Sequence, residues 1–467
     1  MNQELDLRSV ARELFAAALR SVDAGQAVRQ SVRLEGSRLT IRDTNIDLDA
    51  PSLAIYALAI GKASLPMAAA LDEVLKERLT EGLVIGSPQR NPAAITFSTR
   101  QRFRSAWHLI EGGHPLPNNA SLIAAQSAFA LLKRANEESA LVIFLISGGG
   151  SAMIEWPRND LITLAELRDA NRLLIACGAS IAEINAVRRS FSATKGGGLA
   201  AYAPNSKQVT LIISDAAVGQ EAIVASGPSC EPPHDGPKAA DVITRYGLAR
   251  DLPPSILNLI NEAHLQSPLH GGNRLRDHYV LLDCGIAIEA ATNEARRRGF
   301  AAEFTNDISE QPIAEGCDLM LSRLKGLRSG VKPANRLACL ISGGEFSCPV
   351  KGAGIGGRNA ETALRCALKI DEMRRRNGTA DRLTRIAVLS AGTDGIDGNS
   401  PAAGAVATED SVERAIILGM DPLDFLERSD AYGFFDALGD TIVTGPTGTN
   451  VRDLRITLLE YTDLFAL

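Results

Sequence analysis

The stretch Ile341-Ser-Gly-Gly-Glu345, followed shortly by Val350-Lys-Gly-Ala-Gly-Ile-Gly-Gly-Arg-Asn-Ala-Glu361, passes from an apolar run through glycines into a helical pattern. Glycines let a backbone approach a ligand closely, and the first N–H groups of a helix have no partner within it. Apolar residues from Ala363 onward recur at i, i+1, i+4 and i+5, which gives the helix one face to place against a sheet. The stretch therefore predicts an anion-binding loop between a strand and a helix, with Lys351 and Arg358 adding charge. A long glycine turn is the structural alternative.

The same order of apolar run, polar or glycine-rich corner and helical pattern recurs along the chain. The runs are Ala54–Ile60, Leu141–Ile146, Val209–Ile213, Tyr279–Leu282, Leu337–Ile341 and Ile386–Leu389. This alternation is typical of α/β proteins with largely parallel or mixed sheets. Because ligands bind outside the carboxyl ends of strands in open sheets, we expect the polar corners to converge.

Composition excludes several classes of protein. The 467 residues are 45% hydrophobic and 22% charged, with 41 glycines, which is typical of a loop-rich α/β enzyme. A net charge of −6, without a basic cluster interleaved with aromatic residues, argues against nucleic-acid binding. The 7 cysteines lack Cys-x-x-Cys spacing, and no long apolar segment predicts a membrane helix. We expect a cytoplasmic protein whose partners are small molecules, and a homodimer is compatible with the sequence.

The best linker candidate is Ser229-Cys-Glu-Pro-Pro-His-Asp-Gly-Pro237, because its prolines block regular structure. It places a domain boundary near residue 235 and predicts an N-terminal α/β domain over 1–235 and a C-terminal one over 236–467. Residues 8–21 have the apolar spacing of an amphipathic helix, which we expect to pack on the first domain.

Familiar motifs are mostly absent. Gly61-Lys62 resembles the end of a P-loop, but Tyr56 and Ala63 stand where that motif needs Gly and Ser or Thr. Ser147 and Ser151 lack a nucleophile elbow, and the histidines lack metal-ligand spacing. Gly352-x-Gly354-x-x-Gly357 fits the dinucleotide fingerprint as a pattern, although Pro349 precedes it, so a nicotinamide-dependent enzyme remains an alternative.

The corner residues suit phosphoryl transfer, which needs cations and N–H groups for phosphate oxygens, carboxylates for Mg²⁺ and a base for the attacking hydroxyl. Lys62 and Arg358 supply cations, and Lys195 lies in a second glycine loop. Asp215 ends a strand, and Asp394 lies in Thr393-Asp-Gly-Ile-Asp-Gly398. The structural alternatives are a surface lysine for Lys62 and an Asx turn for the acids of this last segment.

Motifs spread over nearly the whole chain then support a resemblance. They are Ala59-Ile-Gly-Lys-Ala63, Gly112-Gly-His-Pro-Leu-Pro117, Ile146-Ser-Gly-Gly-Gly-Ser-Ala152, Asn185-Ala-Val-Arg-Arg189, Lys195-Gly-Gly-Gly198, Ala225-Ser-Gly-Pro228, Gly356-Gly-Arg-Asn359, Gly392-Thr-Asp-Gly-Ile-Asp-Gly398 and Thr444-Gly-Pro-Thr-Gly-Thr-Asn-Val451. Together they resemble the class II glycerate 2-kinases, a family with a C-terminal MOFRL domain whose members also carry the label hydroxypyruvate reductase. The resemblance implies two α/β domains, the first Rossmann-like, with the active site in the cleft between them. It also implies transfer of a phosphoryl group from ATP, with Mg²⁺, to the 2-hydroxyl of D-glycerate.

The resemblance and the chemistry together assign roles to particular residues. Lys62, Asp215 and Arg358 match positions of active-site Lys, Asp and Arg in such proteins, and Asp215 and Asp394 are expected to bind Mg²⁺. The residues expected at the nucleotide phosphates are Ser147, Gly148, Gly149, Gly150, Ser151, Lys195, Gly196 and Gly197. Those expected at the substrate are His114, Arg188, Glu345 and Asn359.

The sequence also departs from the family pattern. Val218-Gly-Gln220 replaces a Gly-Asp-Asp step, with Glu221 the nearest acid, and Ile355, Ala360 and Asn118 stand where the family has a basic residue, Gln and an acid. Two alternatives therefore stay open. One is an NAD(P)H-dependent reductase, whose ribose partner would have to be Asp371 or Glu372. The other is a divergent member that acts on, or senses, another small hydroxy acid.

Overall fold

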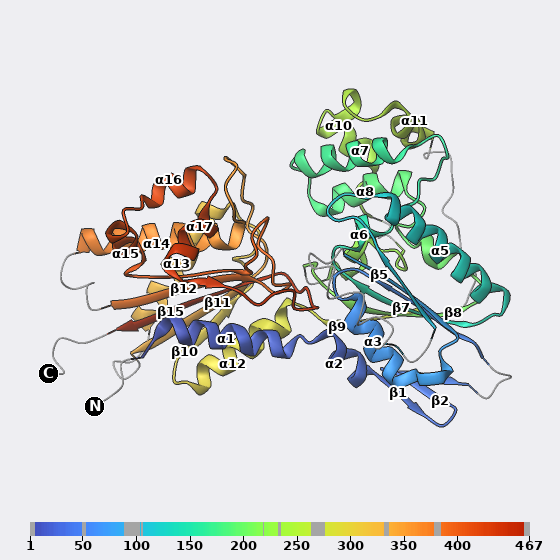
Figure 1. Cartoon of the computed structure of the whole chain (residues 1–467), viewed down its shortest axis with the longest axis horizontal. Helices are drawn as coiled ribbons and strands as arrows, with labels where there is room; N and C mark the ends of the chain where they lie inside the picture. The colour runs from blue at the N-terminus through green and yellow to red at the C-terminus, as the bar shows by residue number, and fades with distance from the viewer. Residues whose placement is uncertain are drawn as a thin grey trace. The chain divides into compact units, whose positions relative to one another are not determined.

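The chain folds into two compact units, labelled by element in Figure 1. The computed structural model describes residues 5–48, 53–87, 103, 106–217, 219–231, 235–262, 276–330, 336–377 and 384–461. Unit 1 combines Met1–Asp23 with Asp283–Leu467, and unit 2 is Ala24–Leu282. The boundary expected near residue 235 falls inside unit 2. Ser229 and Cys230, at the start of the expected linker, are buried in that unit, and Pro232 and Pro233 lie outside the described residues.

Unit 2 contains a 6-stranded parallel sheet of order β6-β5-β4-β7-β8-β9. Its strands are β4 (Ile55–Ile60), β5 (Glu81–Gly86), β6 (Trp107–Glu111), β7 (Leu141–Ser147), β8 (Lys207–Ile213) and β9 (Arg276–Leu282). The central strands β4 and β7 are buried at every residue, as expected for strands covered on both faces. The order reverses between β4 and β7, and such a switch point is where open parallel sheets bind ligands.

The rest of unit 2 surrounds this sheet. The helices are α2 (Ala24–Ser31), α3 (Ser64–Leu75), α5 (Asn119–Glu137), α6 (Gly150–Met153), α7 (Leu164–Ala176), α8 (Ile181–Phe191), α9 (Gly198–Ala201), α10 (Ala239–Arg245) and α11 (Pro254–Glu262). Short 3₁₀ turns lie at Lys76–Arg78, Glu221–Ser226 and Leu248–Arg250, and β1 (Val32–Glu35), β2 (Arg38–Ile41) and β3 (Thr44–Asp47) form a small antiparallel sheet. Helix α5 packs on the sheet face made by Tyr56, Leu58 and Ile60. Helices α7, α8, α10 and α11 form a separate apolar cluster, seen together in Figure 1.

Unit 1 contains a 6-stranded mixed sheet of order β10-β11-β15-β12-β13-β14, in which only β10 and β11 pair in parallel. The strands are β10 (Ala301–Thr305), β11 (Leu337–Gly343), β12 (Thr384–Gly392), β13 (Gly404–Thr408), β14 (Thr441–Ile442) and β15 (Asp453–Tyr461). The helices are α1 (Leu7–Ser21), α12 (Cys284–Arg297), α13 (Ile313–Gly330), α14 (Arg358–Asn377), α15 (Ser411–Ile417), α16 (Pro422–Glu427) and α17 (Ala431–Leu438). The predicted α/β class with parallel or mixed sheets is confirmed.

The N-terminal helix was predicted correctly but its packing was not. Helix α1 begins after Asp6, whose side chain accepts the N–H of Arg8, and it buries Leu7, Val10 and Leu14. It packs on α12 and on β12 and β15 of unit 1, not on the first domain. Periodicity defines the apolar face of a helix but not the partner that covers it.

A buried arginine organises the sheet of unit 1. Arg455, on β15, is 1% exposed and donates to Ser342 Oγ (3.1 Å) and to the carbonyls of Gly343 (2.6 Å), Gly344 (2.7 Å) and Ile308 (2.9 Å). Its guanidinium lies 3.9 Å from the ring centroid of Phe346. Arg455 thus fixes the backbone where β11 ends.

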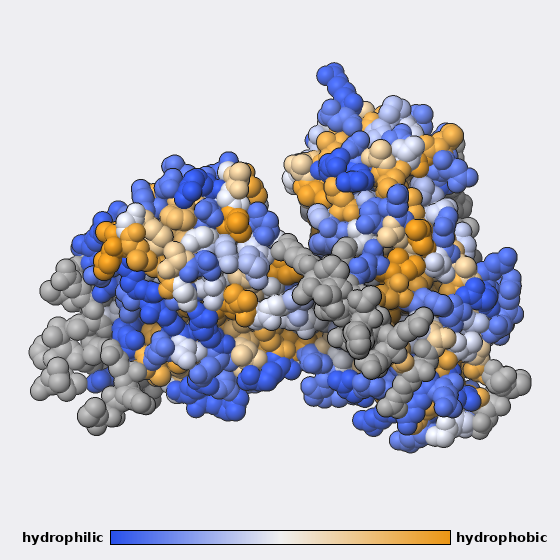
Figure 2. All heavy atoms as spheres, viewed as in Figure 1, coloured by the Kyte–Doolittle hydropathy of each residue, from blue (hydrophilic) through white to orange (hydrophobic). Residues whose placement is uncertain are grey.

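The surface alternates between polar and apolar patches, as Figure 2 shows for one face. Large apolar side chains that remain exposed include Ile416, Ile417, Leu418 and Leu423, on α15, on α16 and between them. No helix in the described part of the chain is long and apolar enough to cross a bilayer.

We predict that Arg455→Met lowers the unfolding free energy of unit 1 by about 3–5 kcal/mol, because several buried carbonyls lose their donor. Arg385→Met is the matched control, since Arg385 lies on β12 of the same sheet with a side chain 27% exposed, and it should cost less than about 1 kcal/mol.

Hydrogen exchange of unit 1 peptides in rising urea measures both effects. Fluorescence of Trp107 and Trp156 reports unit 2 in the same samples and should change little. Equal destabilisation by the two variants would contradict the role given to Arg455.

Candidate functional site

At the switch point of unit 2, the turn after β4 is bound to the turn after β7. The N–H of Lys62 donates to the Gly148 carbonyl (2.9 Å), and the N–H of Ala63 donates to Ser147 Oγ (3.0 Å). Gly61 has φ +114°, and a Cβ there would lie 2.3 Å from the Ser147 carbonyl oxygen, so only glycine fits. Ser147 is fully buried, and its hydroxyl also donates to the Ile60 carbonyl (3.3 Å). Ser147 therefore holds the turn that carries Lys62.

Gly149 lies close to two of the predicted side chains. A Cβ at Gly149 would lie 3.2 Å from Lys62 Cγ and 3.4 Å from His114 Cδ2. Lys62 is half-buried and His114, after β6, is exposed. Asp215 is half-buried just after β8, the strand beside β7. The structure thus brings Lys62, His114 and the Ser147–Gly149 turn together and places Asp215 after the neighbouring strand.

The second glycine loop is bound to a strained turn. The N–H groups of Gly196 and Gly197 donate to the carbonyls of Ser226 (3.0 Å) and Gly227 (2.7 Å). Ala225 and Ser226 have φ of +52° and +64°, in the left-handed region that non-glycine residues rarely adopt. Ser226 Oγ is hydrogen-bonded to Ser151 Oγ and donates to Asn185 Oδ1 (2.8 Å). These N–H groups and hydroxyls therefore already have protein partners.

Two predicted cations lie in the interior. Lys195 is 1% exposed, and its Nζ lies 2.7 Å from Glu155 Oε2. Burial lowers the pKa of Lys195, and the Glu155 carboxylate opposes that shift. Arg188 is also buried, and its Nε donates to Asn171 Oδ1 (2.8 Å). Because the ammonium is buried against Glu155, we interpret Lys195 as a residue that positions the loop rather than as a phosphate ligand.

In unit 1, Arg358 opens α14 and forms ion pairs with two carboxylates. Its Nε and Nη2 contact both oxygens of Asp453, with Nη2 3.1 Å from Oδ1, and its Nη1 lies 3.1 Å from Glu345 Oε2. Burial alone would lower the pKa of Arg358, but Asp453 and Glu345 raise it above its ordinary value. Asp453 is the first residue of β15, between the ends of β11 and β12.

The start of α14 is capped by Asp397. The N–H groups of Asn359 and Ala360 donate to its two carboxylate oxygens (3.0 and 2.8 Å). Burial raises the pKa of Asp397 to about 6, although these N–H groups favour the charged form. Asn359 is buried and accepts a hydrogen bond from Ser390 Oγ (2.7 Å), and Asp394 accepts the N–H of Ile396 (3.0 Å) in an Asx turn.

The prediction that the loop at 350–357 binds an anion through its backbone N–H groups is corrected by the structure. The N–H groups of Lys351, Gly354, Ile355 and Gly356 donate to Ser429 Oγ, the Arg428 carbonyl, Asp430 Oδ1 and Asn399 Oδ1. Side chains and a carbonyl of the same unit occupy the donors that the prediction left for a ligand. The glycines of this loop instead allow it to pack against residues 428–430.

The carboxylates expected to bind Mg²⁺ belong to different units, Asp215 to unit 2 and Asp394 to unit 1. Among the described residues, no group of three or more His, Cys, Asp or Glu side chains is arranged to hold a metal ion. Of the positions that depart from the family pattern, Val218 lies outside the described residues. Glu221 accepts the N–H of Gly219 (2.7 Å), and Asn118 caps α5 through Ser121 (3.0 Å).

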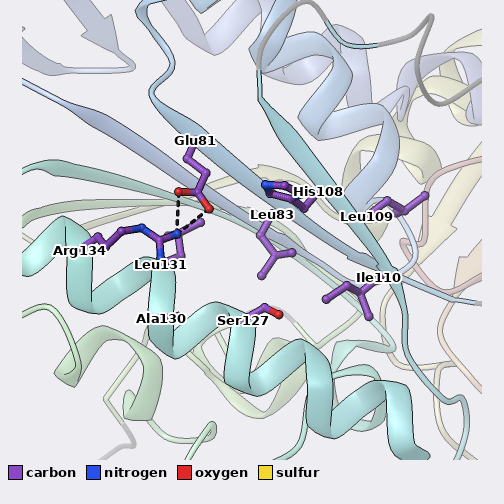
Figure 3. A pocket seen from close by; sticks show the side chains of 9 residues that line it. All are labelled: Glu81, Leu83, His108, Leu109, Ile110, Ser127, Ala130, Leu131 and Arg134. Carbon is purple, nitrogen blue, oxygen red and sulfur yellow. Dashed lines mark hydrogen bonds and ion pairs between the residues drawn. The ribbon is translucent and has the colours of Figure 1, made fainter.

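A cavity of about 430 Å³ lies between α5 and the strands β5 and β6, as Figure 3 shows. Its lining includes the ion pair Glu81–Arg134 (2.6 Å) together with His108 and Leu131. None of the predicted site residues lines it. Because it begins at the amino end of β5, away from the strand ends that bind ligands in such sheets, it is not the candidate site.

Sequence reasoning missed several residues that shape the site. Asp453 starts a strand without a glycine-rich corner, and Glu155 precedes Lys195 by a long interval, so no local pattern links them. No sequence pattern indicates that Asp397 caps α14 either, because that helix begins far from Asp397 in the sequence. The signal available for Asp453 was an acid placed directly before the apolar run of β15.

Comparison with known proteins identifies the family of the chain. The family model "Domain of unknown function (DUF4147)" matches residues 10–261, and the "MOFRL family" model matches residues 338–453. A D-glycerate 2-kinase of Thermotoga maritima is 30% identical, with 97% of this chain and 98% of that protein covered. A putative hydroxypyruvate reductase of Agrobacterium vitis is 34% identical, with 98% and 95% covered.

A solved structure titled glycerate kinase, also from Thermotoga maritima, has 29% sequence identity and a TM-score of 0.74 over 97% of this chain and 99% of that one. Sequence and fold thus agree along nearly the whole length. The chain belongs to the glycerate 2-kinase family, in which a DUF4147 domain precedes a MOFRL domain.

Proposed function

We propose that the protein is a kinase that transfers the γ-phosphoryl group of ATP to the 2-hydroxyl of D-glycerate, giving 2-phosphoglycerate and ADP. The observation that carries the proposal is the placement of Lys62, Asp215 and Arg358. Lys62 and Asp215 follow strands of a parallel sheet, and Arg358 opens a helix, in a chain similar to named glycerate kinases along nearly its whole length. Phosphoryl transfer depends chiefly on such positioned charges.

Unit 2 supplies Lys62, His114 and Asp215. The ammonium of Lys62, carried on the turn that Ser147 and Gly148 fix, would neutralise charge on a phosphate. His114, exposed beside Gly149, would bind an oxygen of the substrate. Asp215, half-buried after β8, would accept the proton of the attacking hydroxyl. Gly149 and Gly150 would lie beside the phosphates. The residues that position the loops around them are Ser151, Lys195, Gly196 and Gly197.

Unit 1 supplies Arg358, with Glu345 and Asn359 beside it. The Arg358 guanidinium suits a carboxylate or phosphate oxygen, and its orientation is fixed by Asp453. Mg²⁺ needs only one or two protein carboxylates beside phosphate oxygens, so Asp215 of unit 2 or Asp394 of unit 1 could bind it although the described residues contain no larger cluster. When bound, the ion would neutralise phosphate charge.

The reductase alternative has less support, although one relative is named a putative hydroxypyruvate reductase. Asp371 and Glu372, the acids available for a ribose, lie within α14 and form ion pairs with Arg375 (2.9 Å) and Arg376 (2.5 Å). Of the fingerprint glycines, Gly352 and Gly354 pack on Arg428 and Asp430, and Gly357 packs on Asp397 and Gly398. A cytoplasmic location and a homodimer remain predictions.

We predict ADP release that requires both D-glycerate and Mg²⁺, and an Arg358→Ala variant whose turnover per folded molecule falls by about 10³-fold. Because this variant leaves the buried Asp453 carboxylate without its partner, it should also be less stable, and circular dichroism gives the folded fraction in the assay. Arg375→Ala is the control, because Arg375 lies on the same helix with a side chain 67% exposed, and it should keep full activity. A coupled assay for ADP, run beside NADH and NADPH oxidation with hydroxypyruvate, makes the measurement. Nicotinamide oxidation without ADP release would contradict the proposal.

We predict that kcat/KM falls as the pH is lowered, with an apparent pKa of about 6. The reason is that protonated Asp397 can no longer accept both N–H groups at the start of α14. The native pKa exceeds the ordinary value of 3.8, so the native state alone holds this proton between those values. The stability contribution of Asp397 therefore decreases as pH rises through that window, and acid unfolding is not the cause of the lost activity.

An Asp397→Asn variant should lose this acidic limb, since an amide does not titrate. A limb of unchanged midpoint in the variant would assign the pH dependence to another group. Circular dichroism at each pH verifies that both proteins remain folded.

A further inference from the structure

The donors of Arg358 are divided between a buried and an exposed carboxylate. Nε and Nη2 are used by Asp453, so Nη1 is the part of the fork that faces Glu345, at 3.1 Å. If Arg358 binds an anionic oxygen of a substrate, as the proposed function requires, it must use the donors that Asp453 leaves, which are the second N–H of Nη2 and both N–H groups of Nη1. Of these, Nη1 is the atom that Glu345 faces. In the structure that position is occupied by a carboxylate of the protein.

A substrate anion cannot displace Asp453 from Arg358. Its side chain is 4% exposed, and it lies in the ladder of β15, opposite Gly392 of β12. Burial raises the pKa of Asp453, but Arg358 outweighs burial and holds it below its ordinary value. A buried carboxylate that lost this partner would be a costly unpaired charge. The contact with Asp453 is therefore permanent.

Glu345 is different, because its side chain is 38% exposed while its backbone is fixed. The preceding residue, Gly344, donates its N–H to the Asp453 carbonyl (3.1 Å) and accepts from Arg455 Nη1 (2.7 Å). Gly344 has φ +109°, and a Cβ there would lie 2.7 Å from the Ser309 carbonyl oxygen. The backbone cannot shift, but the Glu345 side chain can turn toward solvent by changing rotamer.

We propose that Glu345 is an internal substitute for the substrate anion: its carboxylate occupies Arg358 Nη1 in the free protein, and a carboxylate or phosphate oxygen of the substrate displaces it. This inference rests on the proposed function and deepens it by assigning one residue to the competition for the same site. The exchange replaces one anion by another beside the Arg358–Asp453 pair, so the net charge around Arg358 is the same in both states when the incoming anion carries a single charge.

Neighbouring charges explain why displacement is required. Asp394, Asp397 and Asp453 already lie around the start of α14 and the end of β12. A substrate anion bound while Glu345 stayed in place would add a further negative charge to this group. With Glu345 turned away, Nη1 of Arg358 offers the incoming oxygen its two N–H donors, while Asp453 stays bound to Nε and Nη2. Glu345 thus sets the anion affinity of Arg358 without touching the reacting atoms.

Isothermal titration of inorganic phosphate and, separately, of D-glycerate into the full-length protein tests the proposal. Glu345→Gln should bind at least one of them about three- to tenfold more tightly than wild type, since a half-exposed ion pair no longer competes. Tightening for phosphate alone assigns Nη1 to the transferring group, and tightening for D-glycerate alone assigns it to the substrate carboxylate. Glu345→Asp, which withdraws the carboxylate by one methylene, should tighten binding in the same direction.

Glu310→Gln is the matched control, because it removes the same charge from an acid of unit 1 that is 61% exposed and ion-paired with Arg452. It should leave both affinities within about twofold. Affinities in Glu345→Gln equal to those of the control, or weaker than wild type, would overturn the proposal. Binding is measured without turnover, so a protein that releases no ADP but shows the tightening loses the proposed function and keeps this inference.

Discussion

The ion pair between Arg358 and Asp453 is the constraint on which the site of unit 1 depends. Asp453 can be buried as an anion only because a guanidinium meets both of its oxygens. That requirement fixes the first residue of α14 against the first residue of β15. Arg455, two residues further along the same strand, holds the carbonyls at the end of β11 and therefore the position of Glu345. Asp453 and Arg455, two residues apart on β15, thus position the guanidinium of Arg358, to which we assign the binding of an anion, and the backbone before Glu345.

Unit 2 fixes the positions of its loops mainly with hydrogen bonds between neutral groups, together with one buried ion pair. Hydrogen bonds join one loop to another. They use the hydroxyls of Ser147, Ser151 and Ser226 and the N–H groups of Gly196 and Gly197. Glu155 and Lys195 form a buried pair beneath these loops. Because such pairs contribute little net stability but are costly to break, their effect is to fix one arrangement of the edge that carries Lys62. The glycine-rich motifs of unit 2 therefore connect one loop to another by hydrogen bonds.

The sequence predicted the positions of the strands well, but it did not predict which residues form hydrogen bonds and ion pairs with the loops and site residues. Apolar runs gave β4, β7, β8, β9, β11 and β12 within a few residues, because continuous burial leaves a local signal. Lys62 and Arg358 were recognisable as charges at a strand end and a helix start. The glycine loop at 350–357 was misread, because the acceptors of its N–H groups come from residues 428–430 and Asn399, far along the chain. Asp453 was invisible for the same reason, since its role exists only after β15 inserts between β11 and β12.

The most direct test of this account is a double-mutant cycle on kcat/KM with Arg358→Ala, Asp453→Asn and the double variant, all under D-glycerate, ATP and Mg²⁺. If Asp453 acts only by fixing Arg358, each single change lowers kcat/KM by about 10³-fold and the double variant is no worse than the poorer single one. Losses that multiply in the double variant would contradict the account, because they would show that Asp453 and Arg358 act independently.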